Sequence, residues 1–104
     1  MRLPTYRNRK YLDWLKGQPC LVCKHLPCDP AHQSLGWPSG TGIKGPDSFA
    51  LPLCRRCHHR QHQIGEVAFW AEVFMTGEQE RLFLHGMVAR WCIFYFTKFL
   101  EIGK

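Results

Sequence analysis

Apolar and polar positions change their spacing along the chain, and the first regular spacing is helical. Leu12 and Leu15 recur on one side of residues 9–16, which predicts a short helix that buries this side. Asn8 precedes the segment and can cap its first turn, and Gly17 follows it and can end it. We therefore expect a short amphipathic helix near the start of the chain.

The next part of the chain lacks a long regular pattern. Residues 27–47 are rich in proline and glycine, which excludes a long helix or strand there. A short extended piece fits around residues 31–33. Residues 48–53 alternate, with apolar side chains on one side, and predict a second short strand. Pro52 limits it to an edge strand or a brief strand, because proline has no N–H for a ladder.

Helical spacing returns in the second half of the chain. Residues 57–63 predict a helix that ends at Gly65, and residues 66–75 predict a second helix rich in aromatic side chains. Residues 76–79 read Thr-Gly-Glu-Gln, which has the spacing of a capping box. This box predicts the start of a long helix that runs to about Ile102.

Composition and charge narrow the class of protein. Hydrophobic residues make up 45% of the 104-residue chain, which excludes a disordered tail. Lys and Arg number 14 against 8 acidic residues, and the net charge of +6 favours nucleic acid over membrane as a partner. Neither a secretory signal nor a membrane-length apolar run is evident. We expect a soluble cytoplasmic protein without membrane contact.

Four cysteines form two pairs with the same two-residue gap, Cys20 with Cys23 and Cys54 with Cys57. Zinc takes four tetrahedral thiolates, and a two-residue gap lets both sulfurs of one turn reach a single ion. The pairs predict a structural zinc site, because all four coordination positions are taken. Two disulfides, or free core thiols, are the alternative interpretation.

The other two cysteines have weaker patterns. Cys28 stands alone and is at most a substitute ligand. Cys92 lies in an apolar helical segment and is expected to be a small buried hydrophobic residue.

Three histidines accompany the cysteine pairs. His32 lies in the stretch between the pairs, and His58 and His62 follow the last cysteine. Residues four apart on a helix share a face, so His58 and His62 can point at one metal ion or one phosphate. The alternative is that all three are ordinary surface histidines or neighbours of the zinc site.

Together these residues give a specific pattern. Cys20-x-x-Cys23, Ala31-His32, a glycine-rich stretch ending in Asp47, and Cys54-x-x-Cys57-His58-x-x-x-His62 resemble the HNH (ββα-metal) endonuclease family, and most resemble the short phage and prophage proteins of the Ref and YbcO kind. The resemblance covers about residues 18–65. It implies an α+β fold, a treble-clef-like ββα-metal module with additional N- and C-terminal helices. We expect one domain over 1–104, with the zinc module at 18–65 and a helical extension at 66–104.

The resemblance also implies roles by position. His32 matches the general base that activates water, and His58 matches a ligand of a catalytic divalent ion, Mg²⁺ or Mn²⁺. His62 matches a second ligand or a phosphate contact. Asp47 stands where the family usually has Asn and would brace the loop that presents His32. Ala31 replaces a metal-binding residue, and Asp29, two residues before it, is the candidate substitute.

The resemblance implies DNA as the partner. The expected phosphate contacts are Lys44, Arg55, Arg56 and Arg60, since charge on the DNA backbone dominates such binding. No base-reading motif is evident, so we expect weak sequence preference. The aromatic residues of 66–104 have helical spacing, which favours core packing, and a second apolar face over 82–100 indicates a homodimer through the C-terminal helices.

The sequence therefore favours a metal-dependent DNA endonuclease or nickase encoded by a phage or prophage and acting in the host cytoplasm. A zinc-stabilised DNA-binding module without catalysis is the second hypothesis, in which Ala31 and Asp47 mark a decayed site. A phage protein-interaction factor that uses the aromatic C-terminal segment is the third.

Overall fold

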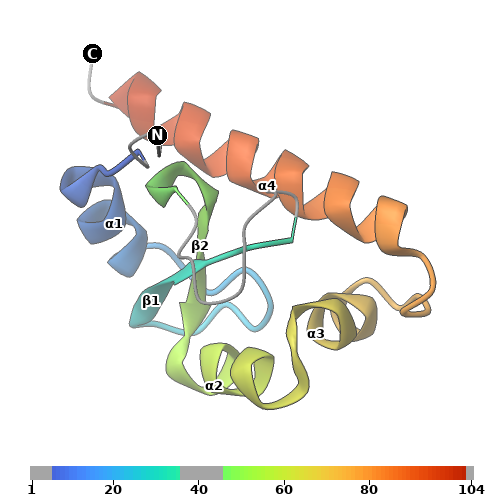
Figure 1. Cartoon of the computed structure of the whole chain (residues 1–104). Coiled ribbons are helices and arrows are strands. Elements are labelled where there is room, and N and C mark those ends of the chain that lie inside the picture. The colour runs from blue at the N-terminus through green and yellow to red at the C-terminus, as the bar shows by residue number, and fades with distance from the viewer. Residues whose placement is uncertain (1–5, 36–45, 103–104) are drawn as a thin grey trace, which may run out of the picture.

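The computed structural model describes residues 6–35 and 46–102 (Figure 1). The elements of this part of the chain are α1 (Arg9–Lys16), β1 (Cys28–His32), the short 3-10 helix η1 (Asp47–Phe49), β2 (Ala50–Cys54), α2 (Arg55–Ile64), α3 (Glu66–Val73) and α4 (Arg81–Ile102). The two strands lie in the middle, with α4 on one side and α2 and α3 on the other (Figure 1). The expected α+β class is confirmed.

The strands form a two-stranded antiparallel sheet within the described residues. Cys28 pairs with Cys54 at one end, and His32 pairs with Ala50 at the other. Pro30 lies opposite Pro52 in this register. In a two-stranded sheet both strands are edge strands, and an edge strand tolerates proline, which has no N–H to donate. The edge position predicted for Pro52 is therefore confirmed, and β2 leads directly into α2.

The predicted first helix is confirmed, with the predicted caps. The Asn8 side chain accepts a hydrogen bond from the Tyr11 N–H at 3.0 Å, and Gly17 ends the helix. Leu15 is fully buried, as expected, but Tyr11 is buried as well. The Tyr11 hydroxyl donates to the Ala50 carbonyl at 3.1 Å, so this ring fixes α1 to β2. The pattern of aliphatic residues alone missed this anchor.

The cap gives a first testable prediction. Replacing Asn8 with alanine should lower the free energy of unfolding by about 1 kcal/mol, because the Tyr11 N–H loses its acceptor. Asp13→Ala is the matched control, since Asp13 makes only exposed ion pairs with Arg9 and Lys16 on the same helix. Urea unfolding should show a change within about 0.5 kcal/mol for the control. Equal losses in the two variants would contradict the capping role.

The remaining helices differ from the prediction mainly in where they begin. Helix α2 begins at Arg55 rather than at residue 57, and Gly65, with φ of 90°, ends it as expected. The predicted start of the long helix at 76–79 is wrong, because α4 begins at Arg81. Met75 takes a φ of 56° at the end of α3, and the Thr76 N–H bonds back to the Ala71 carbonyl. Thr76 therefore closes α3 instead of capping α4.

The core joins the segment 18–65 to the segment 66–104. One buried cluster includes Leu51 and Leu53 of β2, Trp70 of α3, and Leu84 and Val88 of α4. A second cluster is built on α1, and its partly buried members include the following α4 aromatics: Tyr95, Phe96 and Phe99. Core packing is thus confirmed as the use of many of the aromatic residues.

A buried polar bridge fixes the chain just beyond β1. The Trp70 indole N–H donates to Gln33 Oε1 at 2.8 Å, and the Gln33 amide donates to the Ala31 carbonyl at 2.9 Å. Both side chains are fully buried, so these bonds satisfy groups that have no access to water. The end of β1, which carries His32, is thereby tied to α3. Among residues 6–35 and 46–102, no helix is both long and apolar enough to cross a membrane.

Candidate metal centre and histidine site

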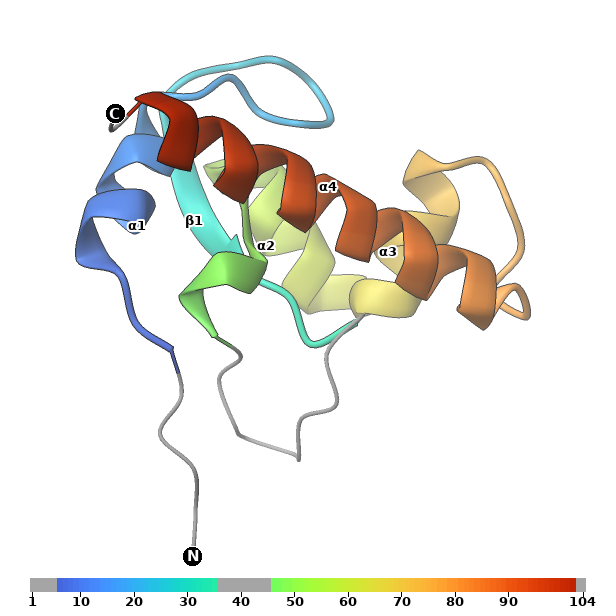
Figure 2. The same cartoon turned by 90° about the horizontal axis from the view of Figure 1, so that it is seen from above.

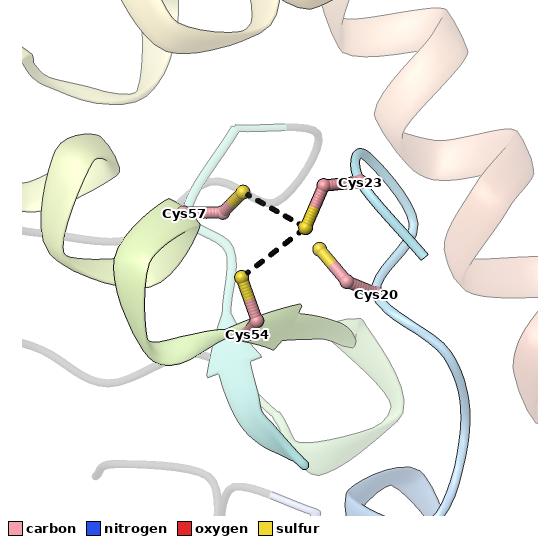
Figure 3. Close-up of side chains that lie close together, drawn as sticks. All are labelled: Cys20, Cys23, Cys54 and Cys57. Atoms are coloured by element: carbon pink, nitrogen blue, oxygen red, sulfur yellow. Dashed lines mark hydrogen bonds between the residues drawn. The ribbon is translucent and has the colours of Figure 1, made fainter. Parts of the chain in front are cut away.

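Two separate pieces of the chain present the four paired cysteines. Cys20 and Cys23 lie in a tight turn after α1, in which the Lys24 N–H donates to the Cys20 carbonyl at 2.9 Å and Lys24 takes a φ of 69°. Cys54 ends β2, and Cys57 lies in the first turn of α2. All four side chains point toward one another (Figure 3).

The four sulfurs have the spacing of a metal site. Their Sγ atoms all lie within 4.8 Å of one another. Cys23 Sγ lies 3.4 Å from that of Cys54 and 3.9 Å from that of Cys57. Four sulfurs at 2.3 Å from a tetrahedral zinc ion would lie about 3.8 Å apart. The free thiols of this cluster could therefore hold a structural metal ion such as zinc.

The surroundings of the cluster already favour one thiolate. Burial opposes ionisation of Cys20, but backbone N–H donors outweigh it and lower the pKa of this thiol to about 7. Burial and the neighbouring thiols raise the pKa of Cys57 instead. Four thiolates so close together repel one another, and a bound cation would remove this repulsion.

The two other cysteines are not part of the cluster. Cys28 is buried and its thiol donates to the His25 carbonyl at 3.4 Å. Burial, together with the nearby thiols, raises the pKa of Cys28 to about 12, which keeps it a thiol. Cys92 is buried in the main core, as expected. His25 had no predicted role, yet its Nδ1 lies 3.2 Å from Cys23 Sγ. Its position two residues after a ligand was the available signal.

His58 and His62 meet on one face of α2. Their Nε2 atoms lie 3.1 Å apart, and their ring centroids lie 4.7 Å apart. Two imidazole nitrogens bound to one ion at 2.0–2.1 Å would be separated by roughly 3–3.4 Å. The i, i+4 spacing therefore brings the two rings together on one face of α2, as predicted, at a separation that one metal ion or one phosphate could bridge.

Asp29 supports this pair from β1. One of its carboxylate oxygens lies 3.3 Å from Nδ1 of His58, the nitrogen opposite the one that faces His62. A carboxylate on the far nitrogen orients a ligating imidazole and fixes its tautomer. Asp29 is thus placed behind His58, whereas the sequence suggested it as a ligand in place of Ala31. Ala31 itself is fully buried in the core.

His32 pairs with a different carboxylate. Its Nε2 lies 2.8 Å from Oδ1 of Asp47, which is buried. The second oxygen of Asp47 accepts the Asn8 N–H at 2.7 Å, and Arg7 lies 3.2 Å from the first. The expected brace is therefore a direct bond to the imidazole. The contribution of residues 7 and 8 was missed, since nothing in the sequence connects them to Asp47.

The structure divides the predicted histidine site into two pairs. Successive side chains of a strand point to opposite faces, so Asp29 lies on one face of β1 and His32 on the other. His58 and His62 contact each other on the Asp29 side, while His32 is held by Asp47. The described contacts therefore form two carboxylate-supported groups, His58 and His62 with Asp29, and His32 with Asp47.

The Asp47 carboxylate gives a second prediction. Burial alone would raise its pKa, but hydrogen bonds from His32 and the Asn8 N–H, with the charge of Arg7, hold the pKa below the ordinary 3.8. A lowered folded-state pKa contributes stability at pH values above 3.8, and this contribution is lost as the pH falls through the folded-state pKa.

Wild-type protein should therefore lose stability more steeply than Asp47→Asn when urea unfolding is compared between about pH 6 and about pH 3. At about pH 7 the variant should be less stable by roughly 1–3 kcal/mol, because a charge-assisted hydrogen bond is weakened. Asp13→Asn is the exposed control. Parallel pH profiles for wild type and Asp47→Asn would contradict this account.

The predicted phosphate contacts differ in their surroundings. Arg55 and Arg56 are exposed in the first turn of α2. Arg60 is also exposed, but Glu72 of α3 binds its guanidinium through two hydrogen bonds of 2.8 and 3.1 Å. Its charge is therefore already paired. Lys44 lies outside the described residues.

The sequence also did not predict that Glu66 holds the chain just after β1. The Glu66 carboxylate at the start of α3 accepts the backbone N–H groups of Ser34 and Leu35, at 2.9–3.1 Å, and the Ser34 hydroxyl. These residues directly follow β1, so Glu66 fixes the chain that leads away from His32. The gap of 32 positions between Ser34 and Glu66 left no local signal.

These features define a small α+β protein with a four-cysteine cluster that could hold a structural metal ion. Residues 2–87 match the family described as protein of unknown function (DUF968), and the chain belongs to that family. It is also similar to the uncharacterized protein YdfU of Escherichia coli (strain K12), with 42% identity over 73 residues. This match covers 66% of the chain and 20% of YdfU, so the chain spans about a fifth of that relative's length. No solved structure matches it significantly.

Proposed function

We propose that this chain is a metal-dependent endonuclease or nickase of the HNH type, which hydrolyses phosphodiester bonds in DNA. The observation that carries the proposal is the pair of Nε2 atoms of His58 and His62, 3.1 Å apart, with the Asp29 carboxylate behind His58. A divalent ion bound there, Mg²⁺ or Mn²⁺, would polarise the phosphate and stabilise the leaving oxygen.

The chain also offers a base. His32 takes the proton from the attacking water, and Asp47 orients its ring through the 2.8 Å bond to Nε2 and stabilises the imidazolium that forms. Asp47 is buried and anchored by the Asn8 N–H, so the ring is held before substrate arrives. In this proposal His58 and His62 bind the metal ion and His32 transfers the proton.

The arrangement of β1, β2 and α2 around the cysteine cluster supports a treble-clef-like ββα-metal module. In this proposal the ion at the four cysteines is zinc, which fixes β2 and α2 against the turn of Cys20 and Cys23. The exposed Arg55 and Arg56 contact the DNA backbone beside the histidines, and the net charge of +6 favours this partner.

A plasmid assay tests the proposal. Zinc-loaded protein should convert supercoiled DNA to nicked or linear DNA when Mg²⁺ or Mn²⁺ is added, and added salt should slow the reaction because it weakens phosphate contacts. Protein without an added divalent ion is the control. Absence of cutting with every divalent ion tested, by protein that is folded and zinc-loaded, would overturn the proposal.

A second function is favoured by one observation. Ala31 is fully buried and carries no ligand atom, although the resemblance places a metal ligand there. A DNA-binding module without catalysis would need no such ligand. Tight, salt-sensitive DNA binding in the absence of cutting would select this function.

A further inference from the structure

Helix α4 has an exposed surface on which apolar side chains lie beside the charged Arg90, Lys98 and Glu101. Seen from above, α4 lies across the rest of the chain with its outer side open (Figure 2). Leu82 is 91% exposed, Ile93 64% and Leu100 50%. The buried residues of this helix, such as Leu84 and Val88, lie on the side that faces the core.

Three of these exposed residues, Leu82, Ile93 and Leu100, belong to a regularly spaced stripe of uncharged residues in which Ala89 and Phe96 are partly buried. Successive steps of four and three residues connect the positions of one stripe: Leu82, Gly86, Ala89, Ile93, Phe96 and Leu100. This is the spacing of the contact positions in a helix pair. Phe96 lies at the edge of the stripe, half-buried against Tyr11, and charged residues are absent from all six positions. The stripe extends for about 27 Å along the helix.

The stripe is symmetric about its own midpoint. Leu82 and Leu100 lie equally far from residue 91, as do Ala89 and Ile93, and Gly86 and Phe96. When two copies lie antiparallel, each pair of equidistant positions meets across the interface. The small Ala89 then receives Ile93 of the other copy, and the two ends pair leucine with leucine. A two-fold axis requires such a self-complementary surface.

We propose that two copies of this chain pair through α4 in an antiparallel arrangement, with Ala89 and Ile93 at the centre of the interface. Antiparallel pairing also sets the helix dipoles in their favourable mutual orientation. Most of the core contacts of each copy come from other positions of its α4, such as Leu84, Val88 and Cys92, which leaves the centre of the stripe accessible. This proposal does not depend on the proposed nuclease activity.

Sedimentation equilibrium of the zinc-loaded chain tests the proposal. Wild-type protein at roughly 100 μM should have twice the mass of the chain, and Ile93→Glu should be monomeric. Met75→Glu is the matched control, since Met75 is 92% exposed but lies outside the stripe, and it should remain dimeric. A monomeric wild type, or a dimeric Ile93→Glu, would overturn the proposal. Circular dichroism and zinc content confirm that each variant is folded.

A charge exchange tests the orientation. Leu82→Glu and Leu100→Lys should each weaken the dimer at least tenfold, because each buries a charge. The double variant L82E/L100K should recover most of this loss, because antiparallel pairing brings the two opposite charges together across the interface. Parallel pairing would oppose like charges instead. Failure of the double variant to dimerise more tightly than both single variants would contradict the antiparallel arrangement.

Discussion

Replacing His58 with alanine should reduce metal-dependent DNA cleavage by about 10³-fold or more, while the protein stays folded. The reason is that His58 and His62 present the two nitrogens that would hold the divalent ion, and the charge stabilisation supplied there is worth several kcal/mol. The measurement is the rate of plasmid nicking at saturating metal. Gln63→Ala is the matched control, since Gln63 is an exposed neighbour on the same helix, and it should cut at the wild-type rate.

Variants of Asp29 and of His32, the two site residues on β1, should lose DNA cleavage in different ways. Asp29→Ala should raise the concentration of metal needed for half-maximal cutting by about 10–100-fold, because His58 loses the carboxylate that orients it. His32→Ala should lower the rate by about 10²–10⁴-fold without changing the metal requirement, and added imidazole should restore part of it. Wild-type cutting by His32→Ala and His58→Ala would refute the assigned roles.

Replacing Cys54 with alanine should abolish cooperative folding of the chain. Zinc binding by four thiolates is worth about 10–16 kcal/mol in small domains, which is as large as the whole stability of a typical domain. Loss of one ligand also leaves three thiols close together near the core. Far-ultraviolet circular dichroism and thermal unfolding should show a chain that is largely unfolded, and elemental analysis should show that it no longer retains zinc.

Cys28→Ala is the matched control for this experiment. Cys28 is equally close to the core and pairs with Cys54 across the sheet, but its thiol lies outside the four-sulfur group. This variant should retain one zinc ion per chain and lose only about 1–2 kcal/mol of stability, the usual cost of a small change in a core. A stable, cooperatively folded Cys54→Ala would show that the cysteines do not hold the fold together.

Local features of the fold could be predicted from the sequence because their physical causes are local. Asn8 caps α1 and Gly65 ends α2 through bonds and backbone angles within a few residues of each. The two cysteine pairs predicted the four-cysteine cluster, since a two-residue gap is enough to bring two sulfurs together. The predicted start of α4 was wrong because Thr76 could either cap α4 or close α3. In the folded chain its N–H bonds to the Ala71 carbonyl, so it closes α3.

The long-range supports could not be predicted, because nothing local encodes them. Asp47 was expected to brace a loop, but only the fold shows that its carboxylate bonds the His32 ring and receives the Asn8 N–H. The pairing of Asp29 with His58 depends on how β1 lies against α2. The division of the histidines into two groups could not be predicted either, since the sequence does not show that Asp29 and His32 lie on opposite faces of a strand.

The central claim is that His58 and His62 form a second metal centre beside the four-cysteine site. A crystal of the zinc-loaded protein soaked in Mn²⁺ tests it most directly, because anomalous scattering distinguishes the two ions. We expect one manganese peak about 2.2 Å from the Nε2 atoms of both histidines, with zinc at the cysteines. Zinc at the cysteines with no manganese at the histidine pair would contradict the claim.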